Sequence, residues 1–281
     1  MDFSEQALIA LSQSFNLARL TKTEITLLYV MDQDTSNPIS KLLFKSEASK
    51  EAKDKIRAKL DKLAEDTTKE SGIKISTLVV KGKVYEQIVK VANRLKATFI
   101  IMGTHNKSSI KNKFIGSNTM SVLRDSPCPV ITIKGKMHRQ GCKNIILPLD
   151  LTKETKEKVS KAVELAKLFG SSVRIVSVLD SHDEFKVNKL KRQINQVKKF
   201  IEEKGIESTA EFVDGSNIAE GVIAYAKKVK GDLIMIMTQQ ETDWIDFFIG
   251  SKAQHVINLS DIPILSIKPF EKKDMSTFTP Y

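Results

Sequence analysis

Two glycine-containing stretches in the first half of the chain carry residues suited to binding a phosphate group. Gly103 directly follows an apolar run, and nine residues separate Asn106 from Gly116-Ser117. Because glycine has no Cβ, the backbone at Gly103 can pass close to a ligand. A Gly-Ser pair is typical of a helix start, where free N–H groups and the positive end of the helix dipole attract an anion. This spacing favours a phosphate site in the first half.

Polar and basic side chains surround the second of these glycines. Ser117 and Asn118 can donate hydrogen bonds, and the loop before them contains Lys107, Lys111 and Lys113. A plainer interpretation stays open, because Gly-Ser also begins ordinary helices and the lysines can simply be solvated. The pattern alone therefore leaves phosphate binding and a structural helix start as alternatives.

The residues that usually carry catalysis are not arranged for it here. The sequence has no P-loop ending in Lys-Ser/Thr and no nucleophile elbow. Its four histidines and two cysteines are scattered without metal-ligand spacing. His105 is a lone loop histidine, and Cys128 between two prolines is typical of a small buried thiol. We expect no catalytic residue and no metal site.

The candidate loop belongs to a long internal repeat. An offset of 134 residues carries Gly116-Ser117 onto Gly250-Ser251, and the apolar run Val130–Lys134 onto Ile264–Lys268. A repeat of this length indicates two whole α/β domains and not a solenoid unit.

A second offset, of 148 residues, relates the starts of the two halves and pairs Asp2 with Asp150. The offset is larger because the first half carries a longer middle segment. Each aspartate stands where the first strand of its half should end. Either carboxylate can cap the following helix or contact a ligand, and both interpretations stay open.

The second half predicts strands and helices in alternation. The expected strands cover Asn144–Leu149, Val173–Leu179, Ala210–Val213, Leu233–Met237 and Ile264–Ile267. The expected helices cover Thr152–Phe169, Val187–Ile201, Ile218–Val229 and a segment that begins near Gly250-Ser251. Continuous apolar strands between amphipathic helices indicate an α/β fold with a mostly parallel sheet covered on both faces.

The first half follows the same order with one omission. It opens at Met1-Asp2, and nothing before that point matches the strand Asn144–Leu149. Either the chain lacks its natural start, or the first sheet forms without that strand. The first strand is central in a doubly wound sheet, so its absence would leave neighbouring strands unpaired.

Composition narrows the broad class of the protein. A length of 281 residues suits two domains, each with its own core. No apolar run is long enough to cross a bilayer, and no signal segment stands at Met1. Two cysteines form no disulfide framework, so a reducing cytoplasm is the expected setting.

The net charge of +11 lies almost entirely in residues 1–140, whose balance is +10. An anionic partner would explain this asymmetry, and so would a solvated, lysine-rich helix surface, which we favour. Nucleic-acid binding is not expected, because few aromatic residues interleave with the basic ones.

The order of elements, Gly103, the later Gly116-Ser117 and the run Pro127–Val130 resemble the universal stress protein family. The resemblance covers almost the whole chain as a tandem pair. It implies two Rossmann-like domains of the adenine nucleotide alpha hydrolase-like kind, at 1–135 and 143–270, followed by a tail at 271–281. Each would hold a five-stranded parallel sheet, the first without its first strand. It also implies that the halves pair through their last strands as an intrachain pseudo-dimer, with a homodimer as a further option.

Members of this family frequently bind ATP or a related adenine nucleotide. Their signature is Gly, two residues, Gly, nine residues, then Gly followed by Ser or Thr. In the first copy Asn106 replaces the middle glycine, and asparagine tolerates a left-handed backbone best among the other residues. In the second copy Met237 and Gln240 replace both leading glycines. The resemblance implies cofactor-binding residues Asp2, Gly103, Thr104, Asn106, Gly116, Ser117 and Asn118, with Asp150, Gly250 and Ser251 in the second copy.

The loop Glu241–Phe248 of the second copy holds three acids and bulky aromatics, which oppose a triphosphate. We therefore expect an adenine nucleotide in at most one half, the first. The favoured function is a cytoplasmic stress-response regulator that binds the nucleotide without turning it over. Weak ATPase activity would need a base and metal ligands that the sequence does not contain. The alternative is a dimerisation or regulatory protein that acts through protein contacts, which the aromatic residues Trp244–Phe248 favour.

Overall fold

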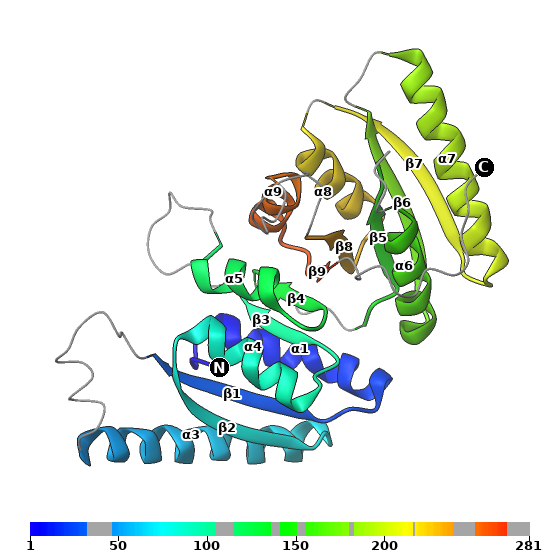
Figure 1. Cartoon of the computed structure of the whole chain (residues 1–281). Helices are drawn as coiled ribbons and strands as arrows, with labels where there is room; N and C mark the ends of the chain where they lie inside the picture. The colour runs from blue at the N-terminus through cyan, green and yellow to red at the C-terminus, as the bar shows by residue number, and fades with distance from the viewer. Residues whose placement is uncertain are drawn as a thin grey trace.

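The computed structural model describes the chain except for residues 33–46, 105–114, 136–140, 151–154, 180–182, 216, 239–250 and 269–281. The described residues form two α/β halves that meet along one sheet (Figure 1). The loop Glu241–Phe248 lies outside the described residues, as do the expected N-cap Thr152 and the expected C-terminal tail.

The second half has the expected alternation of strands and helices. Its elements are β5 (Asn144–Pro148), α6 (Thr155–Phe169), β6 (Ser172–Leu179), α7 (Glu184–Glu203), β7 (Ser208–Asp214), α8 (Ile218–Lys228), β8 (Leu233–Met237), α9 (Ser251–Leu259) and β9 (Ile264–Ile267). The strands lie in the order β7-β6-β5-β8-β9, and all neighbouring pairs are parallel. This confirms the parallel sheet, with the first strand at its centre.

The first half repeats the order without a counterpart of β5 among the described residues. Its elements are α1 (Glu5–Thr21), β1 (Ile25–Asp32), α3 (Glu47–Ser71), β2 (Ile75–Gly82), α4 (Val84–Leu95), β3 (Ile100–Gly103), α5 (Ser117–Asp125) and β4 (Val130–Ile133). The pair β1-β2 forms a sheet of its own, whereas β3 and β4 join the five strands of the second half. The expected division into one sheet per half is therefore replaced by a seven-stranded and a two-stranded sheet, because none of the described strands lies between β1 and β3.

Local sequence fixes several helix ends. The Ser4 side chain accepts a hydrogen bond from the Ala7 N–H at the start of α1, and Asp183 caps α7 in the same way. Such caps satisfy N–H groups that have no partner within the helix.

The N-terminal amino group of Met1 lies at the edge of β1. Its nitrogen donates a hydrogen bond to the Leu28 carbonyl oxygen over 2.5 Å. In the second half, 148 residues later, the Leu149 N–H donates to the Val176 carbonyl over 2.9 Å. Met1 therefore occupies the place of the residue that follows the central strand in the other copy. Burial lowers the pKa of the Met1 amino group.

The two halves pair through their last strands, as the resemblance implied. Strand β4 runs antiparallel to β9, and Ile131 stands opposite Leu265, its own counterpart at the offset of 134. This register places a pseudo-twofold axis at that residue pair. The intrachain pseudo-dimer is confirmed.

Helices cover both faces of the seven-stranded sheet. On one face α1, α6 and α7 contribute buried side chains such as Ile9, Val159 and Ile194. On the other face α5, α8 and α9 contribute Val122, Val222 and Val256 among others. A smaller cluster, Leu11, Leu27, Leu60, Ala64 and Val79, packs α1 and α3 against β1 and β2. Among the described helices, none is both long enough and apolar enough to span a bilayer.

Candidate functional site

The N-terminus of α5 is exposed at the place where the sequence predicts phosphate binding. Gly116 is the N-cap residue with an extended backbone (φ −62°, ψ 150°), and it makes no side-chain cap. Gly116, Ser117 and Asn118 are exposed, while Thr119 is buried and anchors the first turn. A Cβ added to Gly116 would meet no atom within 4 Å. The first N–H groups of α5 have no partner within the helix, as at any helix start, and groups of this kind can bind an anion.

Thr104 lies at the end of β3, beside the end of β4. Its N–H donates to the Ile133 carbonyl over 2.8 Å, and its buried hydroxyl lies 3.3 Å from the same oxygen. The second copy repeats both contacts between Thr238 and Ile267. The residue thus fixes the strand end from which the predicted glycine loop departs.

Gly103 is closely approached by the first turn of α1. A Cβ at Gly103 would lie 2.6 Å from the backbone oxygen of Gln6, which no relaxed side chain allows. The absence of a side chain here lets α1 pack directly on β3. Close packing of α1 therefore also explains why residue 103 is a glycine, in addition to the expected approach of a ligand.

Gln6 is a polar residue of this region that the sequence patterns did not indicate. Its amide nitrogen donates to the Gly135 carbonyl over 3.3 Å, and its Oε1 is buried without a hydrogen-bond partner among the described atoms. A buried acceptor without a donor is uncommon and suits a ligand N–H or a water. No motif or repeat pointed to it, because its place depends on how α1 sits over β3.

Asp2 and Asp150 make different hydrogen bonds in the structure. The Asp2 carboxylate accepts hydrogen bonds from the backbone N–H and the hydroxyl of Ser4, at 3.0 and 2.6 Å. It thus supports the residue that caps α1. The backbone oxygen of Asp150 accepts from the Thr155 hydroxyl over 3.0 Å. Ligand contact by either carboxylate stays a prediction.

Part of the predicted site falls on residues without a description. Asn106 and Gly250 lie outside the described residues, and Ser251 is placed only as the first residue of α9. The structure brings Gly103 and Thr104 to the end of β3, with Gly116, Ser117 and Asn118 at the start of the next helix.

Two hollows on the described surface lie away from this region. One is lined by Arg174, Glu211 and Tyr225 among others, and another by residues of α3 and β2. Within the described residues, no group of three or more His, Cys, Asp or Glu side chains could hold a metal ion.

Comparison with known proteins decides the family. The model of the universal stress protein family matches residues 1–134 and again residues 141–268. This chain belongs to the universal stress protein family. The two matches agree with the internal repeat and with the two α/β halves of the structure.

Curated and solved universal stress proteins resemble one or both halves. Universal stress protein MJ0577 of Methanocaldococcus jannaschii is 34% identical over 148 residues, which cover 48% of this chain and 91% of that protein. The crystal structure of a universal stress protein from Archaeoglobus fulgidus covers 97% of this chain and 96% of its own, with a TM-score of 0.76 and 20% identity. A protein from Pseudomonas aeruginosa described as functionally unknown covers 96% and 89%, with a TM-score of 0.68 and 18% identity. At these identities the solved structures support the tandem fold alone.

Proposed function

We propose that the first half of this universal stress protein binds ATP or a related adenine nucleotide, with the phosphates at the N-terminus of α5. The observation that carries the proposal is the exposed Gly116-Ser117 helix start, with open space where the Cβ of residue 116 would be. Family membership supports the choice, because this pair matches the last part of the family's nucleotide signature. The positive end of the helix dipole and the free N–H groups would hold the phosphates.

Each predicted residue has a specific part in this site. The N–H groups of Ser117 and Asn118, with their side chains, would bind phosphate oxygens. Gly103 and Asn106 would let the loop approach the ligand, and Thr104 would hold that loop to β4. Asp2 would contact the nucleoside end if it leaves Ser4.

In the second half, Asp150, Gly250 and Ser251 would be the corresponding residues. We propose that this half does not bind the nucleotide, since Met237 stands at the end of β8 where the first half has Gly103. The chain acts as a regulator in the cytoplasm, where its two free cysteines stay reduced, and it does not turn the nucleotide over.

The direct experiment is to purify the protein without added nucleotide, denature it, and identify released small molecules by mass spectrometry. Titration calorimetry with ATP on the emptied protein then gives the stoichiometry. One site per chain supports the proposal. Two sites would contradict the asymmetry between the halves, and an absence of both released ligand and heat would favour the alternative of a protein that acts through protein contacts.

A further inference from the structure

Asn258, in the last turn of α9, reaches across from the second half to the first. Its side-chain Oδ1 accepts a hydrogen bond from the backbone N–H of Ile115 over 2.9 Å. Its backbone oxygen accepts from the Lys134 ammonium over 2.6 Å. Asn258 is half-buried, so these bonds are partly shielded from competing water. One residue of the second half thus binds the first half at two points.

Ile115 directly precedes Gly116, the N-cap of α5. The bond to Asn258 therefore fixes the backbone at the point where the first-copy loop enters the helix. The direction of that entry determines where the free N–H groups of Ser117 and Asn118 point. If these N–H groups had to become ordered before binding phosphate, the entropy cost would weaken binding. Groups already held in place bind without that cost.

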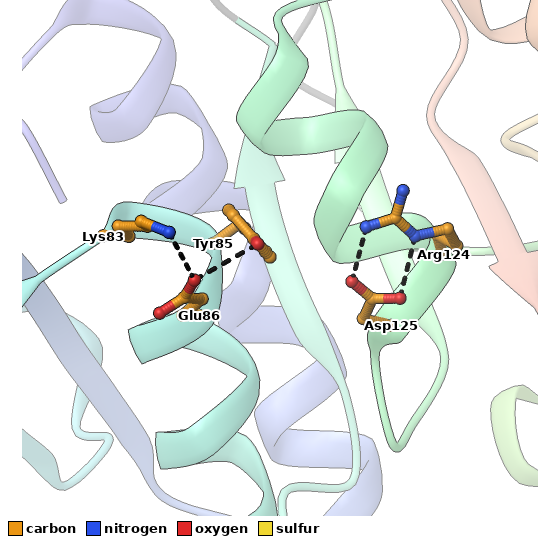
Figure 2. A network of polar contacts seen from close by, with 5 residues as sticks. All are labelled: Lys83, Tyr85, Glu86, Arg124 and Asp125. Carbon is orange, nitrogen blue, oxygen red and sulfur yellow. Dashed lines mark hydrogen bonds and ion pairs between the residues drawn. The ribbon is translucent and has the colours of Figure 1, made fainter. Parts of the chain in front are cut away.

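The repeat does not provide the reverse contact through the same position. The counterpart of Asn258 at the offset of 134 is Arg124, in the last turn of α5. An arginine side chain only donates hydrogen bonds, so it cannot accept one from a backbone N–H. Arg124 instead turns to Asp125, with Nε–Oδ1 and Nη2–Oδ2 distances of 2.9 and 2.8 Å (Figure 2).

From these contacts we infer that Asn258 is a positioning residue through which the second half sets the nucleotide affinity of the first. The inference rests on the proposed function of the first half. It assigns the second half of the chain a supporting role for the proposed phosphate site of the first half. Pairing of β4 with β9 joins the two halves, and the amide of Asn258 then reaches Ile115 directly before α5.

The test compares ATP affinity and backbone hydrogen exchange in full-length variants. Asn258→Leu removes the acceptor at similar volume, and Asn258→Ala is the second variant if the first misfolds. Each should weaken ATP binding by about three- to tenfold, the usual effect of losing one hydrogen bond. Exchange of the Ile115 amide should become faster in the same variants.

Two controls separate this effect from general destabilisation. Asn258→Asp keeps an acceptor and should retain Ile115 protection, although its added negative charge next to the site can itself weaken ATP binding. His255→Leu changes an exposed residue of the same helix and should alter neither. Wild-type affinity in Asn258→Leu or Asn258→Ala, or equal losses in the His255→Leu control, would overturn the role of Asn258. A wild-type protein that binds no nucleotide would refute the proposed function and this role with it, while Ile115 exchange would still report whether the contact exists.

Discussion

At the scale of single residues, Gly116 offers the cleanest probe of the proposed site. A Cβ fits there without contact, so Gly116→Val should leave folding intact while placing two methyl groups where phosphate would meet the helix. We expect a loss of ATP affinity of at least about a hundredfold, measured by titration calorimetry. An unchanged melting temperature would confirm that the loss is local.

The matched change in the second half is Gly250→Val. We expect it to have little effect on ATP affinity, because the loop of that half lacks the leading glycines. Equal losses in the two variants would refute the asymmetry between the halves. Normal binding by Gly116→Val would place the ligand elsewhere.

The two thiols should be slow to react in the folded protein. Burial raises the pKa of Cys142 to about 12 and also raises that of Cys128. At pH 8 the thiolate fraction of Cys142 is then about one in ten thousand, and the thiolate is the reactive form. Iodoacetamide labelling followed by mass spectrometry should modify both residues much faster in urea than in the native state. Equally fast labelling of native protein would contradict this prediction.

At the scale of elements, the opening between β1 and β3 changes the burial of the strands on both sides. Leu28 of β1 is half-buried, whereas its counterpart Val176 in β6 is fully buried. The residues Ile100–Met102 of β3 are half-buried, whereas Ile234–Ile236 of β8 are buried. In the second half β5 pairs with both neighbours and covers them. Among the described strands, none pairs with β1 or β3 along these facing edges, which are therefore suited to a parallel apolar strand.

Adding the β5 sequence Asn-Ile-Ile-Leu-Pro in front of Met1 should stabilise the first half. The added strand would pair with β1 in the register that β5 uses with β6, and it would bury apolar surface on both faces. We expect the melting temperature to rise by about 5 °C or more. A Gly-Ser extension of equal length is the control. Equal melting temperatures for the two extensions would show that the opening does not accept a strand.

The Met1 amino group should make stability depend on pH. Because burial lowers its pKa below the usual 8.0, the unfolded chain binds this proton more tightly than the folded chain. The free energy of unfolding contributed by this group therefore rises with pH from the folded pKa to about 8, and it is lowest below that window. Acetylation of the N-terminus removes the charge and keeps an N–H for Leu28. It should raise the melting temperature at pH 6 and have little effect at pH 9, and equal effects at both values would contradict this account.

At the scale of the whole molecule, the antiparallel pairing of β4 with β9 joins one sheet edge of the first half to one sheet edge of the second. These two edges are therefore not available to another molecule. Further assembly must then use other surfaces. The aromatic loop Glu241–Phe248, outside the described residues, stays our candidate for such a contact. Its Trp244 can remove on the order of 200 Å² of surface from water when buried.

The double change Trp244→Ser with Phe247→Ser tests that contact. If the loop forms an interface, the change should lower the oligomeric mass or loosen the pairing of the halves, without altering ATP affinity in the first half. Light scattering gives the mass and thermal melting gives the stability. Reduced stability at an unchanged mass would mean that these aromatics fill the pocket of their own domain, and the interface interpretation would then be wrong.

The sequence by itself determined the tandem repeat, the order of strands and helices and the parallel sheet of the second half. It also located the helix start at Gly116-Ser117. These features depend on local patterns, since apolar periodicity selects strand or helix and Gly-Ser marks the beginning of α5. The resemblance added the pairing of the last strands, which the register of Ile131 with Leu265 confirms.

Only the tertiary structure decided how the first half divides without a central strand, with β1-β2 apart from β3-β4. It also decided that Gln6 packs on Gly103 and that Asn258 holds Ile115, residues 143 positions apart along the chain. Neither contact follows from a local pattern. Each depends on how whole elements pack, and packing is a property of the assembled sheet and its helices.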